Sequence, residues 1–201
     1  MQEFYMKKFA IAGAAAALFV VPAAANAQAW VQAESGVDIV SVEGESNTGF
    51  GYGVSAGYDL ALAGGMFVGV QGTFADSDTK RCVRDVMEAG DKACLEAGRD
   101  VAALLRFGTA ITSQSKLYVM AGYANARADV TYDGPSVEAI EDELGVNGGI
   151  GAHGDLDGVR LGAGYEYALN DKLFVKTEYR YTNYENDFSR HAGVVALGAR
   201  F

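Results

Sequence analysis

Hydrophobic and polar residues alternate along most of the chain that follows its N-terminal region. Between Phe50 and Leu60, every second residue is apolar, and the residues between them are glycine, serine or aspartate. Because side chains of a β-strand point alternately to opposite faces, this period of two predicts a strand with one apolar and one polar face. Eight segments follow the pattern, four of them clearly and four more weakly. They are residues 31–40, 50–60, 66–74, 101–109, 117–123, 159–169, 173–181 and 195–201.

The connections between these segments alternate in length. Residues 61–65, 111–116 and 170–171 form short connections, whereas residues 41–49, 76–99, 130–157 and 184–190 form longer or more charged ones. An even number of strands with short turns on one side and long loops on the other is typical of bacterial outer-membrane barrels. The sequence therefore predicts an all-β fold, an eight-stranded antiparallel transmembrane β-barrel. Its short turns and both termini would be periplasmic, and its longer loops extracellular.

The aromatic residues agree with two membrane interfaces. With the first strand running outward, one set falls at the outer rim, namely Phe50, Tyr52, Phe74, Tyr123, Tyr179 and Tyr181. A second set falls at the periplasmic rim, namely Tyr58, Phe107, Tyr165, Tyr167 and Phe201. Aromatic girdles at both interfaces are expected of such a barrel. The alternative is a soluble β-sandwich, whose apolar faces would pack on each other and which would purify without detergent.

The N-terminal region has the features of an export signal. Lys7 and Lys8 precede an apolar run over residues 9–21, which Pro22 ends, and Ala25 and Ala27 give a small-x-small cleavage pattern. The run is shorter than the roughly 20 residues of a spanning helix. We therefore expect residues 1–27 to be a cleaved signal peptide and residues 28–201 to be the barrel domain.

Composition and charge narrow the function classes. The mean hydropathy is only +0.04 although half of the residues are hydrophobic, as expected when lipid-facing and lumen-facing residues alternate. The chain has 26 glycines, which suit a narrow lumen, and only 2 prolines, which would interrupt strand pairing. A net charge of −10 argues against nucleic acid as a partner.

These features resemble a known family, the small eight-stranded outer-membrane proteins with an opacity-type or OmpA/OmpX-like barrel. The resemblance covers the whole mature chain and rests on residues 174–181, on residues 197–201 and on the pairs Gly57-Tyr58, Gly122-Tyr123 and Gly164-Tyr165. A terminal Phe201 after alternating apolar residues is similar to the signal that the barrel-assembly machinery reads in this family. Full-length OmpA-type proteins continue into a peptidoglycan-binding domain, and we expect none to follow Phe201 in this chain.

The polar faces of the predicted strands place charges in the lumen. Five acids, Glu34, Asp38, Asp59, Glu166 and Glu178, are matched by five bases, Arg106, Arg160, Lys176, Arg180 and Arg200. Unpaired charges buried in a narrow barrel are costly, and eight strands leave room only for the barrel's own side chains. We expect a salt-bridged plug, with an ion pathway as the alternative.

The long loops hold the two cysteines and an excess of acids. Cys82 and Cys94 are expected to form a disulfide, because the chain is exported and no histidine lies near to suggest a metal site. The third loop is acidic and includes a predicted short helix at residues 136–144. It is interpreted as a solvated loop, with binding of cations, or bridging to lipopolysaccharide phosphates through them, as the alternative. Its acids are Asp129, Asp133, Glu138, Glu141, Asp142, Glu143, Asp155 and Asp157.

Catalysis has little support in the sequence. Ser189 and His191, with Glu185 and Asp187 nearby, would share one side of the last strand, as a nucleophile and base require, but such pairs occur by chance. His153 has no evident partner. We therefore expect no enzyme, no cofactor and no metal site.

The sequence thus favours a structural or surface-interaction, adhesin-like barrel in the cell outer membrane. Its expected partners are outer-membrane lipid and lipopolysaccharide, the barrel-assembly machinery and an external surface or host ligand. A narrow porin for small solutes or ions is the main alternative, and a lipid A-modifying enzyme is the weaker one.

Overall fold

The computed structural model describes residues 27–42, 45–84, 89–134, 150–185 and 188–201. Within these residues the chain forms nine strands and one short 3₁₀ turn. The strands are β1 (Ala27–Val42), β2 (Glu45–Ala61), β3 (Met66–Ser77), β4 (Lys80–Arg84), β5 (Lys92–Ala110), β6 (Ser115–Asp133), β7 (Ile150–Ala168), β8 (Leu173–Tyr184) and β9 (Phe188–Arg200). The 3₁₀ turn η2 (Ala63–Gly65) joins β2 to β3, and Gly64 and Gly65 adopt positive φ angles of 75° and 77° there, which glycine allows at no steric cost.

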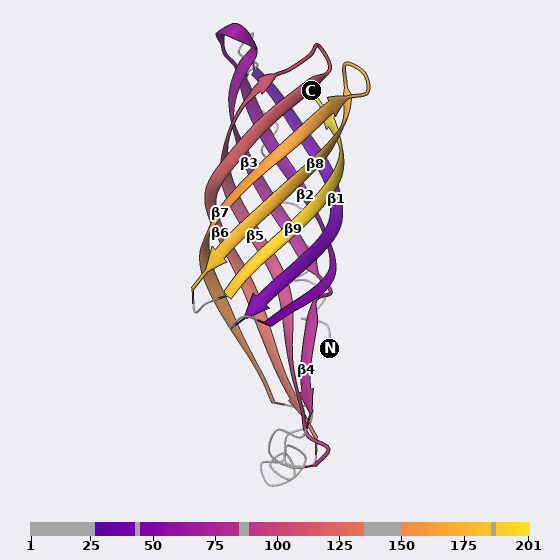
Figure 1. Ribbon diagram of the computed structural model, residues 1–201, viewed down its shortest axis with the longest axis vertical. Helices are drawn as coiled ribbons and strands as arrows, with labels where there is room; N and C mark the ends of the chain where they lie inside the picture. Colours follow the sequence, from indigo (N-terminus) through magenta and orange to yellow (C-terminus); the bar gives the residue numbers. More distant parts are fainter. Residues whose placement is uncertain (1–26, 43–44, 85–88, 135–149, 186–187) are drawn as a thin grey trace, which may run out of the picture.

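Eight of the nine described strands form a closed antiparallel barrel, which confirms the predicted fold class. Pairing runs from β3 through β2, β1, β9, β8, β7 and β6 to β5, and β3 pairs with β5 to close the ring (Figure 1). Strand β4 continues outward after β3 and pairs with β5 beyond the barrel wall. Closure leaves no unpaired edge within the lipid, as a membrane-spanning sheet requires.

The side-chain alternation is confirmed on both faces. Apolar residues face outward and remain exposed, for example Val119, Leu161 and Val195, at 57%, 52% and 63%. Polar and charged residues face inward and are buried. This inversion of the usual globular arrangement removes the soluble sandwich from consideration, because the apolar faces do not pack on each other. Within the described residues, no helix has the length and apolar character needed to cross a bilayer.

The strands are longer than predicted, and this corrects the assignment of all four long loops. Residues 41–49 contain the end of β1 and the start of β2, and residues 184–190 contain the end of β8 and the start of β9. Residues 76–99 were expected to be a loop, but they contain the end of β3, all of β4 and the first part of β5. Residues 130–157 were also expected to be a loop, but they include the end of β6 and the start of β7. A register shift between Ala97 and Asp100 changes the alternation within β5, so a strict period of two ended the predicted strand too early.

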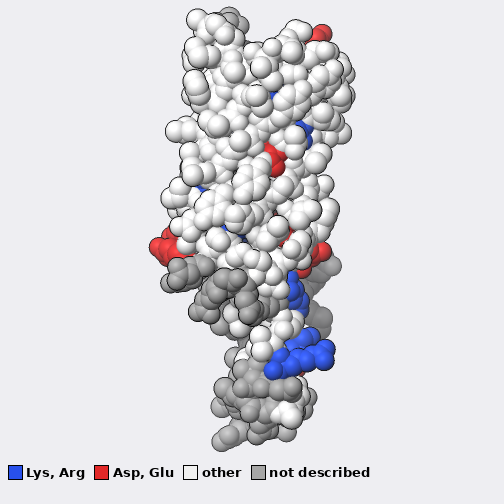
Figure 2. All heavy atoms as spheres, viewed as in Figure 1, with Lys and Arg blue, Asp and Glu red and all other residues white. Residues whose placement is uncertain are grey.

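The two ends of the barrel differ. The short connections β2–β3, β5–β6 and β7–β8, together with the start of β1 and the end of β9, lie at one end, called here the turn end (top in Figure 1). The opposite end, called the loop end, carries the longer connections and β4 (bottom in Figure 1). Figure 2 shows that the barrel surface on the viewed side is largely uncharged, whereas coloured side chains gather toward the loop end. The predicted signal peptide, except for Ala27 at the start of β1, and the helix at residues 136–144 lie outside the described residues.

Candidate functional site

The ten charges predicted for the lumen all point inward. Nine are buried, with exposures from 1% for Asp38 and Arg106 to 7% for Glu34, and the side chain of Arg200 is 10% exposed. Each of these charged residues lies on the polar face of its strand, and that face points into the lumen. Together with two residues that the sequence reasoning missed, they form three clusters along the barrel axis.

The middle cluster centres on Arg180 of β8. Its Nη1 and Nη2 atoms donate to the two carboxylate oxygens of Glu34 at 2.6 and 2.8 Å, and its Nε donates to Glu178 Oε2 at 2.8 Å. Tyr118 donates to Glu178 Oε1 at 2.5 Å, and Ser55 donates to Glu34 Oε2 at 2.8 Å. One guanidinium therefore pairs with two buried carboxylates, and both carboxylates also accept hydrogen bonds from hydroxyl groups.

The cluster nearer the loop end includes the two missed residues, Asp100 and Arg190. Asp100 Oδ2 accepts from Arg160 Nη2 at 2.6 Å and from Arg190 Nη1 at 3.0 Å, and Arg190 Nε donates to Asp38 Oδ1 at 2.6 Å. Tyr184 also donates to Asp100. Arg190 had been assigned to a loop and Asp100 lay just before the predicted strand at residues 101–109, so extending the alternation along both strands is the signal that would have identified them. The cavity bordered by this cluster and Arg180 has a volume of about 30 Å³, which is too small for a solute.

The cluster nearer the turn end combines charges with aromatic rings. Arg106 pairs with Asp59 at 3.2 Å, while Glu166 lies 3.5 Å from Lys176 Nζ and 2.5 Å from Arg200 Nη2. Four inward rings also belong to this cluster, although their apolar character did not suggest a lumen position; they are Trp30, Phe67, Tyr118 and Phe174. Lys176 Nζ is 3.4 Å from the Trp30 ring centroid, and the Arg106 guanidinium carbon is 4.1 Å from that of Tyr118. Aromatic faces stabilise buried cations by their negative quadrupole.

Glycines make room for these rings. A Cβ atom added to Gly164 would lie 2.3 Å from Tyr118, one added to Gly57 2.2 Å from Trp30, and one added to Gly198 2.1 Å from Phe174. The abundance of glycine on the inward face therefore follows from the bulk of the side chains that fill the lumen. In the part of the chain that is described, the lumen is a packed core of ion pairs and rings and not an open channel.

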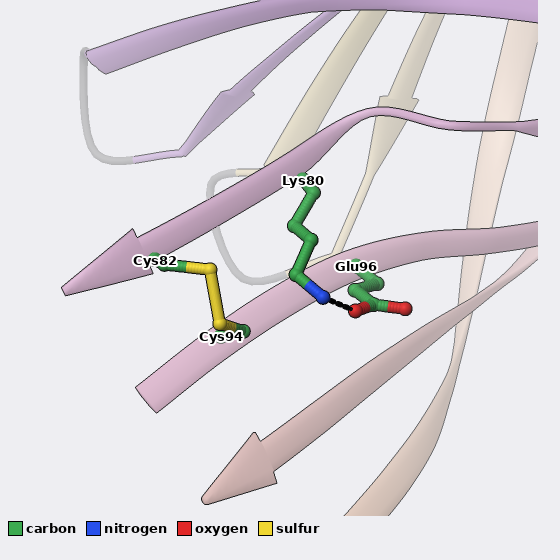
Figure 3. The surroundings of a disulfide bond; sticks show 4 residues. All are labelled: Lys80, Cys82, Cys94 and Glu96. Carbon is green, nitrogen blue, oxygen red and sulfur yellow. Dashed lines mark hydrogen bonds and ion pairs between the residues drawn. A yellow bond between two sulfur atoms is a disulfide. The ribbon is translucent and has the colours of Figure 1, made fainter. Parts of the chain in front are cut away.

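The loop end carries a second feature, a sheet that projects beyond the barrel. It consists of β4 and the outer parts of β5, β6 and β7, and is called here the projecting sheet (Figure 1). The disulfide Cys82–Cys94 joins β4 to β5, as predicted, and Lys80 pairs with Glu96 beside it (Figure 3).

The two faces of the projecting sheet differ in character. The face that continues the lumen wall is apolar and includes Leu95, Ala97, Ala126, Ala128 and Leu156; Ala97 and Leu156 pack on the buried core. The outer face is charged, and Asp155 Oδ1 lies 3.4 Å from Arg127 Nε and 3.3 Å from Arg99 Nη2. Apolar packing on one face and ion pairs on the other explain how strand pairing extends beyond the lipid-facing surface.

One edge of the projecting sheet is free among the described residues. The outer part of β7, residues 150–156, pairs with β6, but its pairing with β8 begins only at Gly158. A long unpaired edge presents backbone donors and acceptors that another strand can bind. This edge is therefore a candidate interaction surface, and it was not predicted because the segment had been interpreted as a loop.

Ser189 and His191, weighed in the sequence as a nucleophile and its base, are not joined by a hydrogen bond among the described residues. His191 Nδ1 lies 2.7 Å from the Tyr179 hydroxyl on the outward surface. His153 is exposed on β7, opposite Asp129. The described acids of the third connection lie on β6 and β7, whereas Glu138, Glu141, Asp142, Glu143 and also Asp187 lie outside the described residues. No group of three or more metal-ligating side chains occurs in the described part of the chain.

Comparisons with known proteins agree with this architecture. The family model described as outer membrane protein beta-barrel domain matches residues 10–201. The crystal structure of Ail, the attachment invasion locus protein of Yersinia pestis, in complex with the heparin analogue sucrose octasulfate, superposes with a TM-score of 0.59. It has 12% identity over 88% of this chain and 99% of Ail. Neisserial surface protein A has a TM-score of 0.55 and 17% identity over 86% of this chain and 97% of its own. Among curated proteins, no match to the sequence was found.

Proposed function

Because the chain belongs to the outer membrane protein beta-barrel domain family, and so resides in the cell outer membrane, we propose that it is a surface-interaction barrel. In this role the barrel anchors the projecting sheet in the outer membrane and presents it outside the cell as an adhesin-like surface. The projecting sheet is the observation that carries the proposal. A disulfide and outer-face ion pairs link its strands, and among the described residues it ends in a free strand edge.

The packed lumen supports this role over conduction. Three ion-pair clusters and four aromatic rings occupy the interior from the loop end to the turn end. A solute would have to break hydrogen-bonded ion pairs, and removing one partner of a buried pair costs several kcal/mol. A narrow porin is therefore the second candidate, and lipid A modification is the third.

Orientation and partners follow from the same architecture. The turn end would face the periplasm and the loop end the outside, as in other bacterial barrels. Outward aromatic residues such as Tyr123 and Tyr165 would contact the headgroup regions of lipid and lipopolysaccharide. Export by cleavage after residue 27 and recognition of the terminal Phe201 by the barrel-assembly machinery belong to the same proposal.

The test removes the outer parts of β6 and β7 from the projecting sheet, with the free edge, and keeps the barrel. Ala126 of β6 pairs with Leu156 of β7, so residues 127–155 can be replaced by Asn-Gly, which favours a two-residue hairpin turn. Cells producing this short-hairpin variant are compared with wild-type cells for retention on polystyrene and on an epithelial monolayer. Loss of retention by a folded variant supports the proposal, and equal retention by both overturns it. Folding is checked by the shift in gel mobility on heating.

A further inference from the structure

The free edge of β7 has a defined set of backbone groups available for pairing. Asp157 accepts a hydrogen bond from the backbone N–H of Glu185 at 3.0 Å, so its backbone groups point to the β8 side. Because alternate residues of an antiparallel strand direct their N–H and C=O groups to the same side, those of Gly151, His153 and Asp155 also point there. In the described residues nothing pairs with these three positions.

The edge also lacks two of the features that protect exposed strands from pairing, proline and lysine. Residues 150–156 contain neither proline nor lysine, and their length in a strand is about 20 Å. His153 and Asp155 are exposed on the outer face, and the ion pairs of Asp155 with Arg127 and Arg99 both use its Oδ1 atom. The edge is therefore accessible to another strand and carries one imidazole and one carboxylate.

The direction of β7 selects the arrangement of two copies. In every copy β7 runs from the loop end to the turn end, so two barrels in one membrane hold their β7 strands parallel. Two barrels in facing membranes hold them antiparallel, and a two-fold axis in the plane between the membranes then relates the copies. Antiparallel pairing about a two-fold axis is an isologous contact, which needs only one self-complementary surface.

Charge complementarity selects the register. His153 and Asp155 are the two positions that can face each other across the strands in a register centred on Gly154, because Gly151 then lies opposite Asp157, whose C=O already accepts from Glu185. A register centred on His153 places two imidazoles opposite each other, and one centred on Asp155 places two carboxylates opposite each other. The register centred on Gly154 places His153 opposite Asp155 of the second copy, twice. An imidazole N–H donates to a carboxylate, whereas like charges directly opposite are destabilising.

We infer that the free edge of β7 pairs antiparallel with the same edge of a second copy in a facing outer membrane, with His153 opposite Asp155 of that copy. The contact would join two cells, and it rests on the proposed surface-interaction role.

The test uses proteoliposomes of the full chain in two dye colours, and the measurement is two-colour coincidence at a fixed lipid concentration. Wild-type vesicles of the two colours are expected to associate. The substitution Asp155→Pro removes a backbone N–H that points to the free edge and is not used in pairing with β6. Vesicles of this variant are expected to show only the coincidence of protein-free vesicles. Asp133→His is the matched control for loss of an exposed acid on β6, and it is expected to leave association unchanged.

A charge exchange tests the register itself. His153→Asp vesicles alone place carboxylates opposite each other, and Asp155→His vesicles alone place imidazoles opposite each other, so each preparation is expected to lose association. A mixture of the two restores both complementary pairs and is expected to associate. Absence of wild-type association, or Asp155→Pro vesicles that still associate, overturns the inference, and so does a mixture that stays apart. The outcome of the vesicle experiment does not determine whether the short-hairpin variant loses retention. The pairing of β7 edges and the surface-interaction role can therefore be contradicted independently.

Discussion

Arg180 binds two carboxylates at once in the middle of the lumen, and this makes it a sensitive position. Arg180→Met leaves Glu34 and Glu178 buried without their guanidinium, and we expect the free energy of unfolding to fall by about 3–5 kcal/mol. Urea unfolding in lipid vesicles, followed by the fluorescence of the single tryptophan, Trp30, measures this loss.

The matched control is Arg99→Met, which breaks an exposed ion pair and is expected to cost less than about 1 kcal/mol. Adding Glu34→Gln and Glu178→Gln to Arg180→Met is expected to recover part of the loss, because no buried charge is then left alone. Equal effects of Arg180→Met and Arg99→Met would contradict the buried-cluster account.

Gly164 tests the close packing of the lumen at a single residue. An added Cβ lies 2.3 Å from Tyr118, so Gly164→Ala is expected to lower the unfolding free energy by about 1–3 kcal/mol through overpacking. Gly72→Ala is the control, because nothing lies within 4 Å of its added Cβ. The same urea titration compares them, and a Gly164→Ala protein as stable as Gly72→Ala would indicate a loosely filled lumen.

Single residues also show where sequence reasoning succeeds and fails. Alternation located Arg180 and nine other lumen charges because every second residue of a strand faces the same side. It missed Asp100, where the register shift in β5 breaks the period, and Arg190, where the charged segment resembles a loop. It could not place Trp30 in the lumen, because an apolar side chain does not reveal by its chemistry which face of a barrel it occupies.

At the level of the strand, the position of a residue along β7 is expected to determine how much a charged substitution on the outward face destabilises the barrel. Leu161 and Leu169 are both exposed, at 52% and 50%, but Leu161 lies within the lipid-facing part of β7 and Leu169 lies at the turn end. Leu161→Arg is expected to cost about 2–4 kcal/mol and Leu169→Arg about 0–1 kcal/mol. Urea unfolding in vesicles measures both, and similar costs would place the membrane elsewhere on the barrel.

The β4–β5 hairpin is expected to depend on its disulfide, while the barrel does not. Closing a loop of this length stabilises by roughly 3 kcal/mol in the chain-entropy model, and the described contacts of β4 are mainly with β5. The variant Cys82→Ser with Cys94→Ser should be cut faster by trypsin near Arg84 and Lys92, yet keep the heat-dependent gel mobility of a folded barrel. Cleavage at the wild-type rate would show that strand pairing alone holds the hairpin.

Strand existence was predictable, but strand length was not. Residues 50–60 and 159–169 carry exposed apolar side chains on the barrel wall, and a lipid-facing wall needs a continuous apolar face, so their alternation is strict. The outer parts of β5, β6 and β7 lie beyond the lipid-facing surface, where both faces tolerate glycine and charge. The projecting sheet and the free edge of β7 were therefore taken for loops.

For the whole molecule, the packed lumen and the projecting sheet are the basis of our proposal that function lies at the surface and not in the interior. The direct measurement is the conductance of purified, refolded protein in a planar bilayer, with Arg106→Ala and Arg160→Ala measured beside the wild type. Arg106 belongs to the cluster nearer the turn end and Arg160 to the cluster nearer the loop end, so each substitution removes an ion pair at one end of the lumen only. We predict no discrete, steady openings from folded wild-type protein. Steady openings whose size changes with either substitution would contradict the account and establish conduction through the lumen.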